Sequence, residues 1–414
     1  MHDALATNAL IDCLERRDLI VCVGSGGVGK TTTAAALGLA AALRGRSVLV
    51  LTIDPAKRLL QALGLPTDGA ATNEPLEVLP RLADQLNLPA GAPLPRLDAM
   101  MLDPERGADQ MFAAMLPDAA ERDQVLGNRV YRALVPILNA APDYVALDLI
   151  ARLHESGSYD LLVLDTPPTH NALDFVRAGS TLSSFINERV LAWFARVPGV
   201  GGKRRSGILA RGSSLAMGLF GRLFGADVLV DIAGFFASFT DVLPRLKART
   251  QQTDALLRAD QTRFIAVTAP GETSLREARH LFDVLKDHEL AVAGFVVNRV
   301  VEAPESIRGD AGRKQAVSKV IEQMRGTGMD QASADRLGDL LAQGAARMGH
   351  LDASDRNHVD ALRSSAAPGV FCSVVAQLEH DIHALPELRD LGERLLAGLR
   401  SPVVLESAAP LKPQ

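Results

Sequence analysis

The chain has 414 residues, of which 47% are hydrophobic and 22% charged, and its net charge is −5. This composition is typical of a globular protein with a large core, and the acidic balance argues against a general nucleic-acid binder. The first residues, MHDALATNALIDCLERRD, contain acids and lack the apolar run of a secretory signal. Since no uncharged apolar run reaches the roughly 18 residues that span a bilayer, we expect a cytoplasmic protein that binds no nucleic acid.

Short apolar runs alternate with helical patterns along the chain, which is the signature of a parallel β-sheet covered by helices. Between the first two runs, an alanine-rich stretch at 30–44 predicts a helix that ends at Arg44-Gly45. This part of the chain is therefore expected to form one β-α-β unit. The predicted strands are 18–24, 46–53, 159–165, 262–269, 291–298 and 370–376.

Three segments interrupt this alternation. Residues 96–150 and 178–258 contain no convincing strand and are predicted to be helical, as is a polar stretch at about 302–366. We expect the first two to form one inserted helical subdomain and the third to be a helical insertion. The remaining α/β core then consists of 1–95, 151–177 and 259–414, the last of which contains the insertion.

A glycine-rich loop, GSGGVGKTT, lies between the first predicted strand and the first predicted helix. It fits the pattern G-x-x-x-x-G-K-[ST], in which backbone N–H groups converge on phosphate oxygens at the positive end of the helix. Lys30 is expected to reach the β- and γ-phosphates, and Thr31 to offer its hydroxyl oxygen to Mg²⁺. The predicted nucleotide-binding residues are Gly24, Ser25, Gly26, Gly27, Val28, Gly29, Lys30, Thr31 and Thr32.

Two aspartates follow later strands. Asp165 closes the apolar run 161–165 and precedes Thr166-Pro167-Pro168, a sharp exit from the sheet, where an acid is expected to anchor Mg²⁺. Asp54 follows the second strand at the same edge of the sheet, where ligands collect. It could orient or deprotonate an attacking water, although on the residues alone a structural strand-end aspartate is the stronger interpretation.

Asn298 ends the fifth predicted strand, and its surroundings in the sequence indicate which nucleotide base is bound. A guanine-specific N-K-x-D motif would need an aspartate three residues further on, and Val301 occupies that position. The base is therefore expected to be adenine, with Asn298 placed to read it. A simple turn asparagine is the alternative.

Together these motifs resemble the ArsA/GET family of ATPases, within the deviant Walker A group, over most of the chain. The resemblance is carried by GSGGVGKTT (24–32), TIDPAKRLLQALG (52–64), YDLLVLDTPPTHNALDF (159–175) and GFVVNRV (294–300). The second and third look like the family's two switch loops. The resemblance implies a P-loop NTPase fold, with a mostly parallel sheet flanked by helices and an inserted helical subdomain.

The resemblance also implies a Mg²⁺-dependent ATPase that forms ADP and phosphate. In that family, ATP at the interface of a dimer closes two subunits and hydrolysis opens them. By similarity, Asp54 is the water-activating acid of the first switch loop, and Asp165 is the acid linked to Mg²⁺, through a water molecule. Thr31 becomes the direct Mg²⁺ ligand and Asn298 the adenine reader.

The chain departs from the family pattern in charge and in cysteines. Ser25 stands where the family pattern G-K-G-G-x-G-K-T has its signature lysine. The positive charge that this lysine normally brings to the phosphates of the partner subunit is therefore missing. We therefore expect slow hydrolysis by the chain alone and a heterodimer with a paralogous ATPase that retains the lysine. The alternative is a homodimer in which Lys57 or Arg58 supplies the charge. The three cysteines stand far apart with no C-x-x-C pair, so we expect no zinc, and metalloid transport is poorly supported.

The second helical segment is rich in phenylalanine. Phe235, Phe236 and Phe239 belong to a helical stripe, which forms either the core of the subdomain or a groove for a hydrophobic client. A basic, glycine- and serine-rich loop at 197–214 is expected to be solvated, and a contact with a phosphorylated partner or an anionic membrane is the alternative. We expect an ATPase that handles a hydrophobic or membrane-protein client. An ATPase subunit for anion or small-molecule export and a weakly hydrolysing regulatory subunit are the alternatives.

Overall fold

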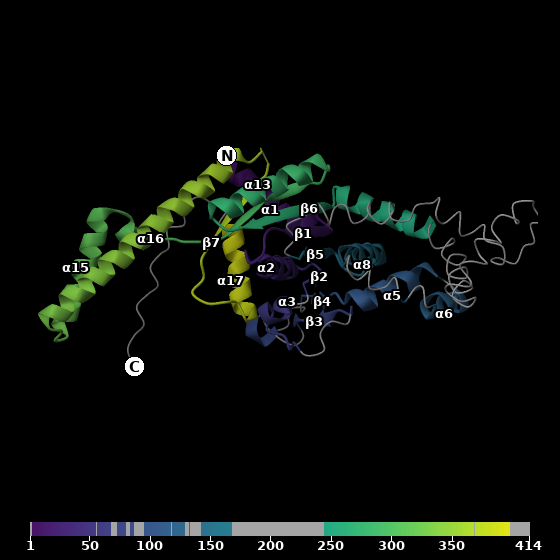
Figure 1. The fold of residues 1–414 in the computed structure, drawn as a ribbon, viewed down its shortest axis with the longest axis horizontal. Helices are drawn as coiled ribbons and strands as arrows, with labels where there is room; N and C mark the ends of the chain where they lie inside the picture. Colours follow the sequence, from purple (N-terminus) through teal and green to yellow (C-terminus); the bar gives the residue numbers. More distant parts are fainter. Residues whose placement is uncertain are drawn as a thin grey trace, which may run out of the picture.

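A computed structural model gives the fold of the chain (Figure 1). The residues that it describes are 2–54, 56–67, 73–79, 83–86, 95–116, 118–128, 132, 142–167, 244–367 and 369–397.

Eight strands of the described residues form one sheet, in the order β3-β4-β2-β5-β1-β6-β7-β8. All neighbouring pairs are parallel except the short β3, which is antiparallel to β4. Strands such as LIVCV in β1 are buried along their whole length, as expected of a parallel sheet covered on both faces. The strands are β1 (Leu19–Val23), β2 (Val48–Thr52), β3 (Leu76–Glu77), β4 (Leu97–Met101), β5 (Leu161–Asp165), β6 (Thr262–Thr268), β7 (Val292–Val300) and β8 (Phe371–Ala376).

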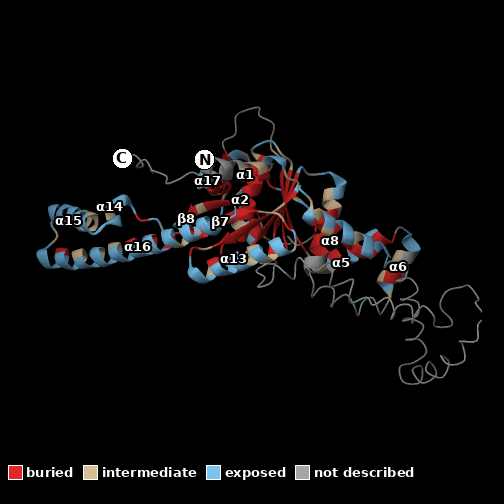
Figure 2. Ribbon diagram, turned by 90° about the horizontal axis from the view of Figure 1, so that it is seen from above, coloured by how far each residue is buried: buried red, intermediate tan, exposed pale blue. Residues whose placement is uncertain are grey.

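Helices cover both faces of this sheet. On one face, α1, α2 and α17 share a hydrophobic core with the strands, and on the other face α5, α8 and α13 pack on a second core. Figure 2 shows the buried strands between these two layers. The helices are α1 (His2–Arg16), α2 (Lys30–Ala42), α3 (Arg58–Ala62), α5 (Pro104–Met115), α6 (Ala119–Gly127), α8 (Pro142–Ser156), α13 (Glu272–Asp287), α14 (Glu305–Arg308), α15 (Asp310–Gly326), α16 (Gln331–Ser365) and α17 (Leu385–Ala397), with a 3-10 turn at Ala83–Leu86.

The alanine-rich helix α2 lies close to the centre of the sheet. A Cβ added at Gly38 would stand 2.4 Å from the Cγ2 atom of Val50, so the helix approaches β2 more closely than any larger residue would allow. The sheet and its helical layers confirm the predicted α/β architecture, in which the carboxyl ends of neighbouring parallel strands meet at one edge.

The prediction that 96–150 contains no strand was wrong. Residues Leu97–Met101 form β4, which pairs in parallel register with β2 inside the sheet. The run LDAMM lacks β-branched residues and carries Asp98 at its second position, which locally resembles a turn. Asp98 is nevertheless buried, because it accepts a hydrogen bond of 2.7 Å from the Tyr159 hydroxyl and one of 3.2 Å from Arg96. The predicted boundary after residue 95 therefore cuts off a strand that belongs to the sheet.

Helices α15 and α16 form an antiparallel pair that extends away from the β7–β8 end of the sheet (Figures 1 and 2). The pair is attached by two buried carboxylates of α16. Asp355 accepts a hydrogen bond of 2.9 Å from the Val301 N–H, and Asp352 accepts one of 3.0 Å from the Ala303 N–H. The exposed large hydrophobic residues of the described chain all lie on this pair, at Val320, Leu340, Met348 and Leu351. None of the described helices is long and apolar enough to cross a membrane.

Candidate nucleotide-binding site

The glycine-rich loop connects β1 to α2, and three of its four glycines (Gly24, Gly27 and Gly29) have positive φ values that other residues rarely adopt. Gly24 has φ +150°, and a Cβ there would stand 2.1 Å from the Val267 carbonyl oxygen of β6. Gly29 has φ +95° and directly precedes α2. The first N–H groups of a helix have no partner within the helix, and they carry its positive partial charge. The loop therefore has the form of an anion site.

Lys30 begins α2, and its side chain is buried beneath the loop. Its ammonium group donates a hydrogen bond of 2.8 Å to the Ser25 carbonyl oxygen, so the side chain curls back along the loop. Burial lowers the pKa of Lys30, while the nearby carboxylates of Asp165 and Asp54 oppose this shift. A phosphate anion at the loop would favour the charged form and give the ammonium a charge-assisted partner.

Asp165 ends β5 and is fully buried. Its Oδ2 atom accepts hydrogen bonds from the hydroxyls of Thr31, at 2.7 Å, and Thr52, at 2.8 Å. Burial raises the pKa of Asp165 to about 6, while the two hydroxyls and Lys30 act in the opposite direction. The Oδ1 atom has no hydrogen-bond partner among the described residues. A buried carboxylate oxygen left in this way is one that a cation, or a water bound to it, would satisfy.

Asp54 lies two residues beyond the end of β2 and is half-buried. Its Oδ1 atom accepts a hydrogen bond of 2.9 Å from the Ala56 N–H, which closes a short turn, and its Oδ2 atom lies 3.9 Å from the Arg58 guanidinium. Asp54 thus has the contacts of a structural aspartate at the end of a strand, the alternative to a catalytic role. The carboxylate also lies close enough to the P-loop to influence the pKa of Lys30.

Asn298 lies within β7, which continues to Val300 through an irregularity in its pairing with β8. The strand is thus longer than predicted. The side-chain amide donates a hydrogen bond of 2.9 Å to the Val28 carbonyl oxygen of the P-loop and accepts one of 2.9 Å from the Arg299 N–H. Asn298 therefore touches the loop directly, across a large separation in sequence.

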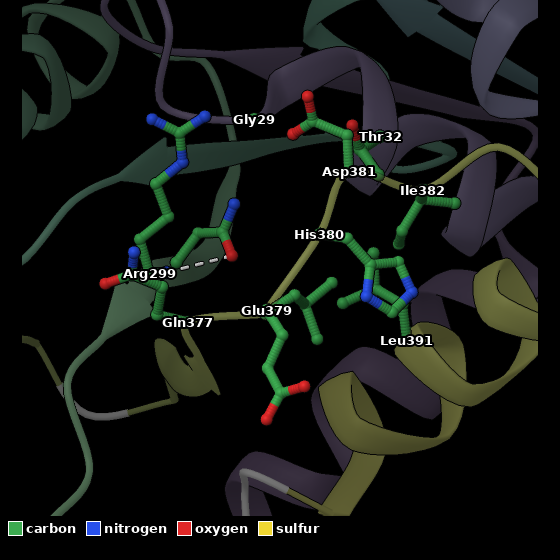
Figure 3. A pocket seen from close by; sticks show the side chains of 11 residues that line it. Gly29, Thr32, Arg299, Gln377, Glu379, His380, Asp381, Ile382 and Leu391 are labelled. Atoms are coloured by element: carbon green, nitrogen blue, oxygen red, sulfur yellow. Dashed lines mark hydrogen bonds between the residues drawn. The ribbon is translucent and has the colours of Figure 1, made fainter.

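A cavity of 380 Å³ opens beside this contact, within the size range of small-molecule sites. In Figure 3, Arg299 and Gln377 lie on one side of it, and Asp381, Ile382 and Leu391 lie on the other. The segment after β8 thus meets the start of α2. The cavity lies next to the glycine-rich loop, since Gly29 and Thr32 are among its lining residues.

Ser25 is the second residue of the loop, where the pattern that the loop resembles has a lysine. Its hydroxyl donates a hydrogen bond to the carboxylate of Glu277 on α13. The Ser25 side chain is therefore held by an acid of the same chain.

The model of the family described as anion-transporting ATPase matches residues 17–195. The chain is also 25% identical to ATPase get3 of Aspergillus terreus over 306 residues, which cover 73% of this chain and 79% of that protein. It is 25% identical to ATPase GET3 of Paracoccidioides lutzii over 282 residues, or 67% and 71% of the two chains. These matches show that the chain is similar to ATPases of the ArsA/GET type over most of its length. A longer relative, ATPase ARSA1 of Chlamydomonas reinhardtii, is 27% identical over 324 residues, or 72% of this chain and 36% of that protein.

The matches support the resemblance inferred from the motifs, the P-loop NTPase type of fold and ATPase activity in general. The P-loop, Asp54, Asp165 and Asn298 all lie at the carboxyl edge of the sheet, near one another. The roles of these residues within the ATPase site remain predictions.

Some residues of this candidate site were not predicted. Thr52, Glu277, Arg299 and the segment 377–382 contact or line it. Thr52 could have been noticed, because it precedes Asp54 at the end of a strand, whereas the other contacts depend on tertiary packing. Phe235, Phe236, Phe239 and the basic loop at 197–214 lie outside the described residues. Within the described part of the chain, no cluster of three or more His, Cys, Asp or Glu side chains could hold a metal ion.

Proposed function

We propose that this ArsA/GET-family ATPase binds Mg-ATP on the loop 24–32 and hydrolyses it to ADP and phosphate. The observation that carries the proposal is the pairing of Thr31 with Asp165 directly beneath the loop. Thr31 donates its hydroxyl hydrogen to Asp165 Oδ2, which leaves the lone pairs of the Thr31 oxygen for a cation, and the buried Oδ1 atom lacks a described partner. Hard oxygen donors of this kind suit Mg²⁺.

Different residues of the site are proposed to bind the phosphates, hold Mg²⁺ and activate the attacking water. The N–H groups of the P-loop and the Lys30 ammonium would bind the phosphates, and Thr31 and Asp165 would hold Mg²⁺, Thr31 directly and Asp165 through a water. When bound, Mg²⁺ neutralises charge on the phosphate oxygens. Asp54 orients the attacking water and accepts its proton, and lone pairs stay available for this role because the turn with Ala56 uses only one of them, on Oδ1.

Asn298 supplies the groups that recognise adenine. Its amide uses one N–H for the Val28 carbonyl, and its oxygen accepts one hydrogen bond from the Arg299 N–H. A second N–H and a second lone pair stay available. This donor and acceptor match a purine nitrogen and the 6-amino group of adenine, and they support the proposal that ATP is preferred over GTP.

We further propose that the chain works as a dimer that closes around ATP, and that the partner supplies the missing positive charge. Ser25 has no positive charge to place at a partner's phosphates, and its hydroxyl donates a hydrogen bond to Glu277 in its own chain. A heterodimer with a lysine-bearing paralogue would supply the charge to this chain's ATP. The rival is a homodimer that uses Lys57 or Arg58, although Arg58 already lies 3.9 Å from Asp54.

The coupled activity that we favour is the handling of a hydrophobic or membrane-protein client by a cytoplasmic protein. Its proposed surface is the helical subdomain made of 96–150, without β4, and 178–258. The candidate groove residues are Phe235, Phe236 and Phe239. Export of an anion or small molecule is the second candidate, because the matching family is described as anion-transporting. A weakly hydrolysing regulatory subunit is the third.

The conversion of ATP by the purified chain tests the proposed ATPase. The chain is incubated with limiting ATP and Mg²⁺, and the ADP formed is measured over time. We expect conversion by the natural chain, even if slow, and at least tenfold less by Lys30→Ala, which loses a charge-assisted phosphate contact. Lys314→Ala, on exposed α15, is the control and should match the natural chain. Equal rates in all three proteins would contradict the proposal.

A further inference from the structure

Thr52 is the last residue of β2, and its side chain is buried between the two acids of the site. The hydroxyl donates a hydrogen bond of 2.8 Å to Asp165 Oδ2 and accepts one of 3.2 Å from the Asp54 N–H. Thr52 and Asp165 are direct register partners on the neighbouring parallel strands β2 and β5. One hydroxyl therefore connects the end of both strands.

The hydrogen bond from Thr52 determines how the Asp165 carboxylate is held. Oδ2 receives two hydroxyls, from Thr31 in α2 and from Thr52 in β2, at 2.7 and 2.8 Å. Two donors from different elements fix the plane of the carboxylate, so that the Oδ1 atom is the one left for a cation or its water. Without the Thr52 hydroxyl, a single donor remains and the carboxylate can rotate.

The same hydroxyl also fixes the start of the segment that carries Asp54. The N–H of Asp54 is bonded to Thr52, so the main chain leaves β2 in a direction set by the residue that also holds Asp165. The positions of Asp54 and Asp165 are therefore coupled through the Thr52 hydroxyl oxygen.

We propose that Thr52 is a positioning residue that joins the Mg²⁺-linked acid Asp165 to the water-activating acid Asp54. The proposal rests on the function proposed above. Thr52 is buried and acts through the Asp165 carboxylate that it orients. Its hydroxyl is the group that matters, whereas its methyl group serves packing.

A binding titration tests this role without relying on turnover. The dissociation constant of ATP is measured in EDTA and over a series of Mg²⁺ concentrations for Thr52→Val, which keeps the shape and removes the hydroxyl. We expect unchanged ATP affinity in EDTA, within about twofold. The Mg²⁺ concentration that gives half of the gain in affinity should rise about tenfold, equivalent to about 1.4 kcal/mol. Should Thr52→Val not fold, Thr52→Ala takes its place in the same titration.

Three further variants separate positioning from simple stability. Thr52→Ser retains the hydroxyl and should restore the Mg²⁺ requirement to within about twofold of the natural chain. Thr262→Val removes another buried hydroxyl, which donates to Leu256 at the opposite end of the sheet, and it should lower the melting temperature without changing the Mg²⁺ requirement. In a protein that already carries Asp165→Asn, adding Thr52→Val should raise the Mg²⁺ requirement by less than twofold, because the carboxylate that Thr52 orients is gone.

The role is overturned if Thr52→Val titrates like the natural chain, or if Thr52→Ser is as impaired as Thr52→Val. Full additivity with Asp165→Asn would also overturn it. These results concern Thr52 alone, provided that Mg²⁺ strengthens ATP binding by the natural chain. A natural chain without Mg²⁺-dependent ATP binding would instead overturn the proposed function together with this inference.

Discussion

Asp165→Asn should change the stability of the nucleotide-free protein in a pH-dependent way. Burial raises the pKa of this carboxyl from 3.8 to about 6, so the folded protein holds the proton more tightly than the unfolded chain does. The stability from this group is therefore fully present below pH 3.8 and is lost as the pH rises through about 6. A shift of this size corresponds to about 3 kcal/mol.

Asparagine removes the buried charge but introduces an amide N–H₂ where Oδ1 has no described partner. An unsatisfied buried donor costs about 1–3 kcal/mol. We therefore expect Asp165→Asn to be less stable than the natural chain near pH 4. Near pH 7.5 it should be equally or up to about 2 kcal/mol more stable, because the natural chain then carries the cost of the buried charge. The gain in stability would come with a raised Mg²⁺ requirement for ATP binding.

Urea denaturation at pH 4 and pH 7.5, without Mg²⁺ or nucleotide, measures this difference. Asp148→Asn is the control, because Asp148 is a buried carboxylate paired with Arg152 at 2.9 Å and Arg249 at 3.0 Å. Breaking that pair should destabilise the protein at pH 7.5 by roughly 3 kcal/mol. The reasoning is refuted if the stability difference between Asp165→Asn and the natural chain is the same at both pH values.

Three other substitutions test separate parts of the site. Asp54→Asn should keep ATP binding, while hydrolysis falls roughly 10²–10⁴-fold if the carboxylate is a general base; unchanged turnover would return Asp54 to a structural role. Ser25→Lys should raise the hydrolysis rate of the chain alone, and brisk turnover by a natural homodimer with no gain from the lysine would rule out the missing-charge account. Gly24→Ala should weaken ATP binding at least tenfold, because the new Cβ would stand 2.1 Å from the Val267 oxygen and the loop must move; an unchanged ATP titration would show that the loop tolerates this shift.

The sequence predicted the parts of the site whose chemistry is local. The glycines, Lys30 and Thr31 follow one another in a single loop, and Asp165 ends a strand that is apolar throughout. Since the carboxyl ends of parallel strands share one edge, their proximity followed from the fold class alone. Asn298 was also placed near the loop, although its hydrogen bond to Val28 could not be foreseen.

Other features depend on partners that are distant in sequence. β4 was missed because Asp98 is compatible with a buried strand only through Tyr159 and Arg96, and a local pattern does not contain the first of these partners. The contact of Ser25 with Glu277 joins residues 252 positions apart. The cavity wall at 377–382 likewise exists only because the segment after β8 returns to α2.

The central claim, that the loop at 24–32 is a Mg-ATP site selective for adenine, is tested most directly by equilibrium titration of the purified chain with ATP and GTP, with and without Mg²⁺. We expect saturable binding of ATP that Mg²⁺ strengthens, weaker binding of GTP, and an ATP affinity several-fold lower for Lys30→Ala. Equal affinities for ATP and GTP would contradict the assignment of Asn298, and ATP binding that is indifferent to both Mg²⁺ and Lys30→Ala would contradict the site itself.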